Sequence, residues 1–232
     1  TIICIERPVA SGSAAELIGK APNPFMATVG LRIEAATPGS GVVFRMELRP
    51  ETIPTYLFKS PEEFRASMRD YVLETLRQGL YGWQVSDCIV TMFQSGFAAP
   101  ATAARDYRLL TPLVLMTALQ QADTVVCEPL HRFQLEIPID CYGRIVALLA
   151  ELRALPQTSA MRDTSCMLEG VIPADQIQVL QQDLPSLTRG EGVLECVFDH
   201  YEPMQAPFPT RPRWDYNPLN RQEYMLHMAK RM

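Results

Sequence analysis

Hydrophobic and polar residues alternate along residues 24–35, which is the pattern of a strand with one buried face. The apolar members of this run are Phe25, Ala27, Val29, Leu31 and Ile33. After a turn at residues 37–41, residues 42–48 alternate in the same way, so we expect the two runs to pair as a hairpin. Residues 49–59 contain two prolines and are predicted to form a loop.

A helix is predicted to begin at Ser60, where the sequence Ser-Pro-Glu-Glu has the form of a capping box. Apolar residues keep helical spacing until Gly79, and residues 84–93 are predicted to form another strand. A second helix is expected over residues 105–122. Because Pro112 lies inside it, we expect a kink there or a later start.

From His131 onward the pattern changes to a strand, a helix, two strands, a helix and a strand. In order, these elements are residues 131–137, 145–152, 156–161 and 164–171, a helix opening at Pro173, and residues 194–198. This β-α-β-β-α-β order is typical of the ferredoxin-like unit. A proline-rich linker follows, and Asn217 and Pro218 are predicted as the cap and first residue of a C-terminal amphipathic helix.

The elements together predict an α+β protein with two domains. We expect a first domain over residues 1–129 and a ferredoxin-like βαββαβ domain over residues 130–203. Residues 204–232 would then form a linker and a C-terminal helix.

The composition indicates a soluble cytoplasmic protein. No apolar run approaches the roughly 20 residues that a membrane span needs. Six single cysteines without a CxxC pair indicate reduced thiols. The first residues, Thr1 to Arg7, include no initiator Met and no leader peptide, so we expect the chain to be part of a longer one.

The net charge of −5 argues against a dedicated nucleic-acid clamp, which needs clustered lysines and arginines. The charge is unevenly distributed. Residues 131–205 carry 5 basic and 11 acidic groups, whereas residues 206–232 carry 5 basic and 2 acidic groups. Only the C-terminal end is therefore basic.

A search for catalytic and metal sites gives only weak candidates. The run from Gly12 to Ala21 does not have the spacing of a phosphate-binding loop. Cys196 and His200 are four residues apart, but no second pair completes a zinc site. Cys88 follows Asp87, yet no residue pattern brings a histidine close to it as a general base. We therefore expect no catalytic residue, metal ion or cofactor in this chain.

Two segments remain as candidate binding sites. The first is an apolar loop without charges, which could contact a partner or fold back on its own domain. Its residues are Gln94, Ser95, Gly96, Phe97, Ala98, Ala99, Pro100, Ala101 and Thr102. The second is the basic C-terminal helix, which could dock on the protein body or contact nucleic acid. Its candidate contact residues are Arg221, Tyr224, Lys230 and Arg231.

Several short motifs resemble the C-terminal half of the tetracycline-resistance ribosomal protection proteins, which are relatives of elongation factor G. They include Glu6-Arg7-Pro8, Pro22-Asn23-Pro24-Phe25, Gly170-Val171-Ile172-Pro173 and, as the most specific, Gln78-Gly79-Leu80-Tyr81-Gly82-Trp83. The resemblance covers nearly the whole chain. It implies a fourth domain, with a βαβ fold related to domain 2 of ribosomal protein S5, followed by a ferredoxin-like fifth domain.

The resemblance also implies a function. Such proteins hydrolyse GTP, with magnesium, in a separate N-terminal domain that is absent from this chain, so the chain itself is not expected to be an enzyme. Their fourth domain enters the decoding region of the small ribosomal subunit and removes tetracycline from ribosomal RNA. The drug-displacing loop aligns with residues 94–102. The implied partner is the ribosome, with no membrane contact, and the protein is expected to be a monomer.

Two alternatives remain open. The tyrosines at the tip of the family's loop fall on Phe97 and Ala98, which favours an elongation factor G paralogue that acts on ribosomes without displacing a drug. The other alternative is a regulatory module in which the ferredoxin-like unit binds a small molecule, because that fold has many functions.

Overall fold

The computed structural model describes residues 3–230. These residues form two compact units. One unit contains Ile5–Val126 and the segment from Gln205 onward, so we call it the discontinuous unit. The other contains Cys127–Met204 with Ile3 and Cys4, and we call it the inserted unit. Each unit has its own buried apolar core.

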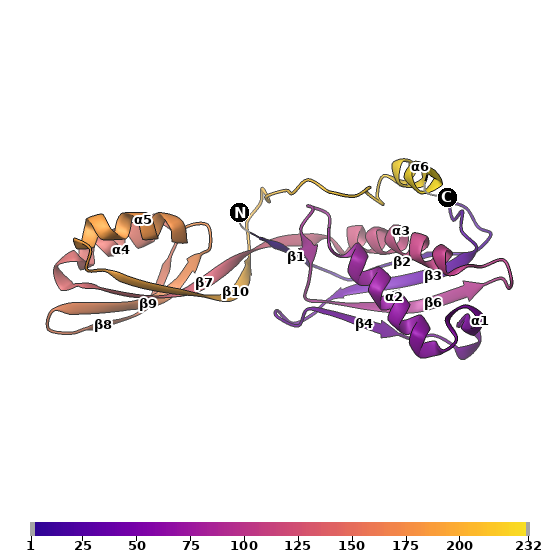
Figure 1. The fold of residues 1–232 in the computed structure, drawn as a ribbon, viewed down its shortest axis with the longest axis horizontal. Coiled ribbons are helices and arrows are strands. Elements are labelled where there is room, and N and C mark those ends of the chain that lie inside the picture. The colour runs from indigo at the N-terminus through magenta and orange to yellow at the C-terminus, as the bar shows by residue number, and fades with distance from the viewer. Residues whose placement is uncertain (1–2, 231–232) are drawn as a thin grey trace. The chain divides into compact units, whose positions relative to one another are not determined.

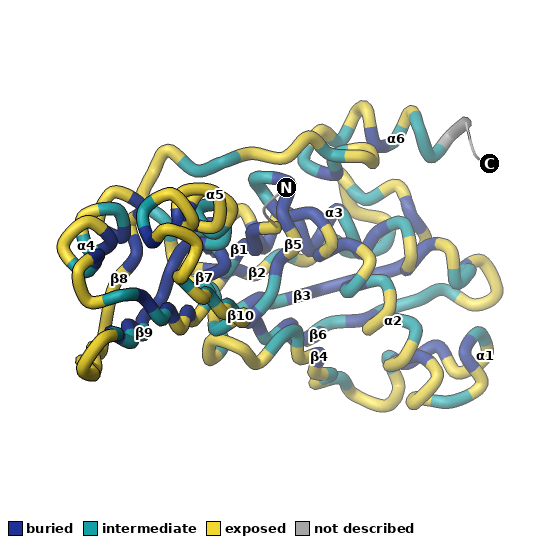
Figure 2. Tube along the Cα trace, turned by 60° about the vertical axis from the view of Figure 1, so that its left-hand side comes forward, coloured by how far each residue is buried: buried dark blue, intermediate teal, exposed yellow. Residues whose placement is uncertain are grey.

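The discontinuous unit is built on a four-stranded sheet with the order β2-β3-β6-β4. These strands are β2 (Gly12–Glu16), β3 (Ala27–Ala35), β6 (Cys88–Phe97) and β4 (Val42–Met46). Two helices pack against the sheet, α2 (Pro61–Thr75) and α3 (Ala104–Ala122), as Figure 1 shows. The predicted alternation along β3 is confirmed, because Ala27, Val29, Leu31 and Ile33 are fully buried (Figure 2).

The hairpin expected between residues 24–35 and 42–48 is wrong. Strand β6 lies between β3 and β4, antiparallel to the first and parallel to the second. Alternation determines which face of a strand is buried, but it does not determine which strand is its neighbour. The apolar strand β6 therefore takes the central position, although it follows β4 in the sequence.

The segments on either side of α2 also differ from expectation. Residues 49–59 contain a 3-10 turn (Pro50–Thr52) and the one-turn helix α1 (Thr55–Phe58) instead of a plain loop. The strand expected over residues 84–93 is divided into β5 (Gln84–Val85), which pairs with β1 (Ile5–Pro8), and the start of β6. The division falls at Asp87, whose φ of 54° does not fit a strand.

Both long helices begin where the sequence predicts. The Ser60 hydroxyl oxygen accepts a hydrogen bond from the Glu63 amide at 3.2 Å, so Ser60 is the predicted N-cap, whereas its own amide donates to the Phe58 carbonyl at 2.6 Å and does not complete a capping box. Helix α2 ends at Thr75, before Gly79. Helix α3 begins at Ala104 and continues through Pro112, so the later start is excluded.

The inserted unit has the predicted β-α-β-β-α-β order. Its elements are β7 (Thr124–Pro138, beginning in the other unit), α4 (Tyr142–Glu151), β8 (Leu155–Met161), β9 (Ser165–Pro173), α5 (Ile177–Thr188) and β10 (Val193–Pro203), with a 3-10 turn (Ile139–Cys141) before α4. Strand β7 pairs with β10 and β9, and β9 pairs with β8. This is the ferredoxin-like strand order, so the predicted α+β fold class is confirmed.

The C-terminal helix α6 (Arg221–Lys230) begins later than predicted. Asn217 does not cap it, because its side-chain oxygen accepts from the Leu219 amide at 3.0 Å in a preceding turn. The cap is Asn220, whose carbonyl oxygen accepts the first helical hydrogen bond, from the Tyr224 amide at 3.0 Å. Within the described residues, no helix is both long enough and apolar enough to cross a membrane.

Candidate functional site

Three loops lie at one end of the four-stranded sheet (Figure 1). They are residues 17–26 before β3, residues 49–59 after β4, and residues 98–103 after β6. Antiparallel pairing places the first residue of β3, Ala27, opposite the last residue of β6, Phe97. Strand β4 runs parallel to β6 and so ends in the same direction. We call these three loops the tip.

The candidate loop Gln94–Thr102 is only partly a loop. Gln94–Phe97 are the last four residues of β6 and pair with Ala27–Gly30 of β3, so the expectation of a loop from Gln94 is wrong. The reason is that Gly96 and Ser95 resemble loop residues in composition, but the sheet continues through them. The exposed part of the turn consists of Ala99, Pro100 and Ala101.

Thr102 is buried and holds this turn closed. Its hydroxyl oxygen accepts from the Ala98 amide at 2.8 Å and donates to the Met26 carbonyl. Its own amide donates to the Ala98 carbonyl at 2.9 Å. One threonine therefore joins the two ends of the turn to each other and to the neighbouring loop.

Tyr56 of α1 also contacts the turn. Its hydroxyl donates to the Thr102 carbonyl at 3.0 Å, and its ring centroid lies 5.5 Å from that of Phe97. Phe97 is half-buried beneath this contact, whereas 46% of Tyr56 remains exposed. Sequence reasoning missed Tyr56, because its neighbours in space are more than 40 residues away in the sequence.

Tyr107 supports the tip from inside the core. Its hydroxyl donates to the Gly96 carbonyl at 2.9 Å and lies 3.3 Å from the Ser95 hydroxyl. Its ring packs edge-on against Phe58 and Phe64. Burial raises the pKa of Tyr107 to about 12, so the hydroxyl stays protonated and available to donate. The strand end that leads into the turn is thereby fixed to the helical layer.

The run Gln78–Trp83 encloses the carboxylate of Glu6, which is fully buried. One carboxylate oxygen accepts from the Leu80 amide at 2.7 Å and the Thr124 hydroxyl at 2.8 Å, and the other accepts from the Tyr81 and Trp83 amides at 2.9 Å. Gly79 is needed here, because a Cβ atom on it would lie 2.3 Å from a Glu6 oxygen.

The other side of the same run holds the C-terminal segment, residues 205–220. The Trp83 indole donates to the Pro209 carbonyl at 2.7 Å, and the Arg211 amide donates to the Tyr81 carbonyl at 2.8 Å. Gly82 has a φ of 85°, and a Cβ atom there would lie 2.0 Å from the Arg211 carbonyl. The most specific motif in the sequence is therefore a structural junction.

The structure places two of the four C-terminal candidates against the protein body. Arg221 forms a two-pronged ion pair with Glu16, at 2.6 and 2.8 Å. Tyr224 is buried, and its hydroxyl donates to the Leu109 carbonyl at 2.9 Å. Lys230 is the last residue of α6, and Arg231 lies outside the described residues.

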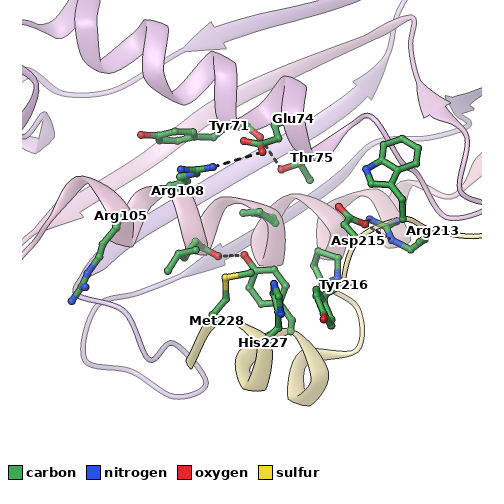
Figure 3. A pocket seen from close by; sticks show the side chains of 15 residues that line it. Tyr71, Glu74, Thr75, Arg105, Arg108, Arg213, Asp215, Tyr216, His227 and Met228 are labelled. Atoms are coloured by element: carbon green, nitrogen blue, oxygen red, sulfur yellow. Dashed lines mark hydrogen bonds and ion pairs between the residues drawn. The ribbon is translucent and has the colours of Figure 1, made fainter. Parts of the chain in front are cut away.

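A cavity of about 500 Å³ lies between α2, α3, the C-terminal segment and α6 (Figure 3). Arg108 and Glu74 line one wall and form a loose, exposed ion pair at 3.8 Å. Arg213 lines another wall and donates to the Gln78 and Gly79 carbonyls at 3.0 and 3.1 Å. The cavity therefore borders the attachment of the C-terminal segment.

Within the described part of the chain, the other candidate catalytic and metal-binding residues are not brought together into a site. Burial raises the pKa of the Cys88 thiol to about 12, which disfavours the nucleophilic thiolate. His200 lies 2.7 Å from Asp199 through Nδ1, while Cys196 faces the core of the inserted unit. Among residues 3–230, no group of three histidines, cysteines or carboxylates could hold a metal ion.

The tip differs in charge from the whole chain. Its three loops contain Lys20, Arg49 and Lys59 and a single acidic residue, Glu51, which gives a net charge of +2. The whole chain has a net charge of −5. The tip is therefore an apolar turn with a basic surrounding, on an acidic protein.

Comparison with protein families divides the chain into two matched regions. Residues 5–123 match elongation factor G, domain IV, and residues 125–211 match the elongation factor G C-terminus. A crystal structure of a protein from Thermus thermophilus has the same fold, with a TM-score of 0.73 and 17% sequence identity. The match covers 99% of this chain and 32% of that one.

Curated relatives match over almost the full length of the chain. The oxytetracycline resistance protein of Streptomyces rimosus is 38% identical, over 99% of this chain and 34% of the relative. The tetracycline resistance protein TetP of Clostridium perfringens is 34% identical, over 96% of this chain and 33% of the relative. The chain thus spans about a third of the length of these relatives.

Proposed function

The chain belongs to the elongation factor G family, and from this membership we propose that it is the ribosome-contacting part of a translational GTPase that releases tetracycline from the small subunit. GTP and magnesium would be bound by a GTPase domain that neither matched region includes. The partner is small-subunit ribosomal RNA at the decoding region, in the cytoplasm, and the protein acts as a monomer.

The observation that carries this proposal is the construction of the turn at Ala98–Thr102. Its exposed residues, Ala99, Pro100 and Ala101, are small and apolar, and they have almost no side-chain freedom to lose on binding. The buried Thr102 holds the ends of the turn together. A turn of this kind can enter a narrow site without rearranging, so little of its binding energy is spent on ordering.

Drug release follows from competition for the same space. A rigid turn that occupies the drug's site cannot bind there at the same time as tetracycline, so stable insertion lowers the drug's occupancy. The tip itself contributes shape and not catalysis, because its exposed turn consists only of alanine and proline. The energy for insertion and release comes from GTP hydrolysis elsewhere in the full-length protein.

A second candidate is an elongation factor G paralogue that acts on ribosomes without displacing a drug. One observation favours it: Phe97 and Ala98 occupy the positions of the family's tip tyrosines. Phe97 is half-buried against Tyr56, and the methyl group of Ala98 offers no stacking surface. The two candidates predict the same ribosome binding and different effects on bound tetracycline.

The decisive experiment replaces Ala99-Pro100-Ala101 by three glycines in the full-length protein. We expect ribosome-dependent GTP hydrolysis to be kept and the release of ribosome-bound tetracycline to fall at least about 10-fold, because a flexible turn must be ordered on binding. Drug release is measured by the fluorescence of tetracycline on ribosomes after addition of protein and GTP.

A matched control replaces Arg162-Asp163-Thr164, an exposed turn of the inserted unit, by three glycines. This control variant is expected to release tetracycline as the unaltered protein does. If the variant with three glycines at the tip releases tetracycline as the unaltered protein does, the turn has no part in drug release. If the unaltered protein hydrolyses GTP on ribosomes and releases no drug, the second candidate is correct.

A further inference from the structure

We propose that Tyr56 is an RNA-contacting residue: its ring is a preformed stacking surface at the tip for an unpaired base of ribosomal RNA. The inference rests on the proposed function and adds a residue from a second loop. Aromatic rings stack on bases of any type, because every base presents a flat π-face. A stacking role requires Tyr56 to be exposed, to be fixed in position and to have basic side chains near it.

Helix α1 divides its side chains between the core and the surface. Phe58 is buried, with its ring centroid 5.0 Å from that of Phe64 and 6.0 Å from that of Tyr107. Tyr56, two residues earlier, is 46% exposed. The core contacts of Phe58 hold this single turn of helix in place, so the ring of Tyr56 is presented on a fixed backbone.

The ring of Tyr56 is also held by its own contacts. Its hydroxyl donates to the Thr102 carbonyl at 3.0 Å, and the ring is tilted by 49° against Phe97 at 5.5 Å. An exposed tyrosine normally loses side-chain freedom on binding. Here that freedom is already restricted in the free protein, which favours binding.

The electrostatic surroundings favour RNA over an apolar protein surface. Lys59 directly follows α1, and Lys20 and Arg49 lie in the same group of loops. Basic side chains attract RNA phosphates, while the exposed ring can accept a base. The turn at Ala99–Ala101 then fills the site, and Tyr56 stacks beside it. This arrangement places an aromatic ring at the tip although Ala98 provides none.

The test uses the full-length protein with Tyr56→Ala, Tyr56→Phe and, as a matched control, Tyr216→Ala. Tyr216 belongs to the same unit and is 41% exposed, close to the value for Tyr56. We expect Tyr56→Ala to weaken ribosome binding about 10-fold, as loss of one stacked base does. Tyr56→Phe keeps the ring and is expected to stay within about 3-fold of the unaltered protein. Tyr216→Ala is expected to leave binding unchanged.

A photoreactive phenylalanine analogue at position 56 identifies the contacted molecule directly. Cross-linking to small-subunit RNA supports the inference. Cross-linking only to a ribosomal protein, or binding that is unchanged by Tyr56→Ala, overturns it. Neither result depends on tetracycline. Tyr56 can therefore prove not to contact RNA although the protein releases the drug. Conversely, Tyr56 can cross-link to RNA although the protein releases no drug. Absence of ribosome binding by the unaltered protein overturns both.

Discussion

Single buried carboxylates connect segments that are distant in the sequence. Asp87 is 3% exposed; one of its oxygens accepts from the Gly41 amide at 3.0 Å and the other accepts from Arg7 Nε at 2.6 Å. Burial alone would raise the pKa of Asp87, but the amides of Gly39 and Gly41 and the Arg7 guanidinium lower it below its ordinary value. One side chain therefore joins β1, the turn before β4 and the start of β6.

This lowered pKa gives a prediction for the pH dependence of stability. A carboxyl group with a lower pKa in the folded state stabilises the fold above its ordinary pKa, and this contribution is lost as the pH falls through the folded-state value. We expect Asp87→Asn to lower the free energy of unfolding by about 3 kcal/mol at pH 7, because it removes the charge that forms the buried ion pair with Arg7 and accepts from the Gly41 amide. The difference from the unaltered chain is expected to shrink below about pH 4.

The measurement is urea unfolding followed by tryptophan fluorescence, which reports the discontinuous unit because both tryptophans, Trp83 and Trp214, belong to it. Asp163→Asn, in the exposed turn of the inserted unit, is the control and is expected to change nothing. A pH-independent difference between Asp87→Asn and the unaltered chain would contradict the assigned ionisation.

At the scale of elements, α6 is attached to α3 beside its internal proline. Pro112 has no amide hydrogen to donate to the Arg108 carbonyl. The carbonyl of the next residue, Leu109, accepts from the Tyr224 hydroxyl at 2.9 Å. Tyr224 and the Arg221–Glu16 ion pair fix the helix at two points. The C-terminal helix is therefore part of the core packing of the discontinuous unit.

Truncating Tyr224 is expected to release α6 and leave the rest of the unit folded. Loss of a buried aromatic side chain costs about 3–5 kcal/mol, which exceeds the support from one partly exposed ion pair. In Tyr224→Ala, amide hydrogen exchange is expected to rise over residues 221–230 and to stay unchanged in β3 and β6. Tyr224→Phe keeps the packing and is expected to cost about 1 kcal/mol. Global loss of protection in Tyr224→Ala would show that α6 stabilises the whole unit.

The elements that the sequence predicts correctly are those with a local cause. The Ser60 N-cap, the long helix around Pro112 and the ferredoxin-like order all depend on residues close together in the sequence. The hairpin fails because strand neighbours are chosen by packing in the complete sheet, where β6 separates β3 from β4. The late start of α6 has a different cause: Asn217 and Asn220 have equal capping propensity, so the sequence alone does not show which of them begins the helix.

The tip is also predicted only in part. The small exposed residues Ala99–Ala101 can be found from composition and from the family resemblance. Tyr56 cannot, because its importance comes from a hydrogen bond to Thr102 and a ring contact with Phe97. The proline-rich sequence around Tyr56 resembles an ordinary loop until these contacts are known.

At the scale of the whole molecule, the tip and residues 131–205 carry net charges of opposite sign. The tip has a net charge of +2, whereas residues 131–205 have 11 acidic and 5 basic groups. An acidic protein is repelled by RNA everywhere except where basic residues gather. We infer that this distribution limits non-specific RNA binding and favours approach through the tip.

Salt dependence tests this inference. Each phosphate contact contributes about 0.7 to 0.9 to the slope of log affinity against log salt concentration. Replacing Lys20, Arg49 and Lys59 by alanine in the full-length protein is therefore expected to reduce the slope of ribosome binding by about 2 to 3. The control replaces Arg65, Arg69 and Arg77, which are exposed on or just after α2, with the same change in net charge. An equal reduction in both variants would show that only net charge matters.

The discontinuous unit is formed by two separate stretches of the chain, and this affects the order in which the protein folds during synthesis. Gln78–Trp83 are synthesised before the inserted unit, but their partners Pro209 and Arg211 follow only after residues 127–204 have been translated. Because domains generally fold as units while the chain emerges, the inserted unit can mature first. Until residues 205–220 have been synthesised, the surface of Gln78–Trp83 that binds them stays exposed, so the discontinuous unit completes its folding last.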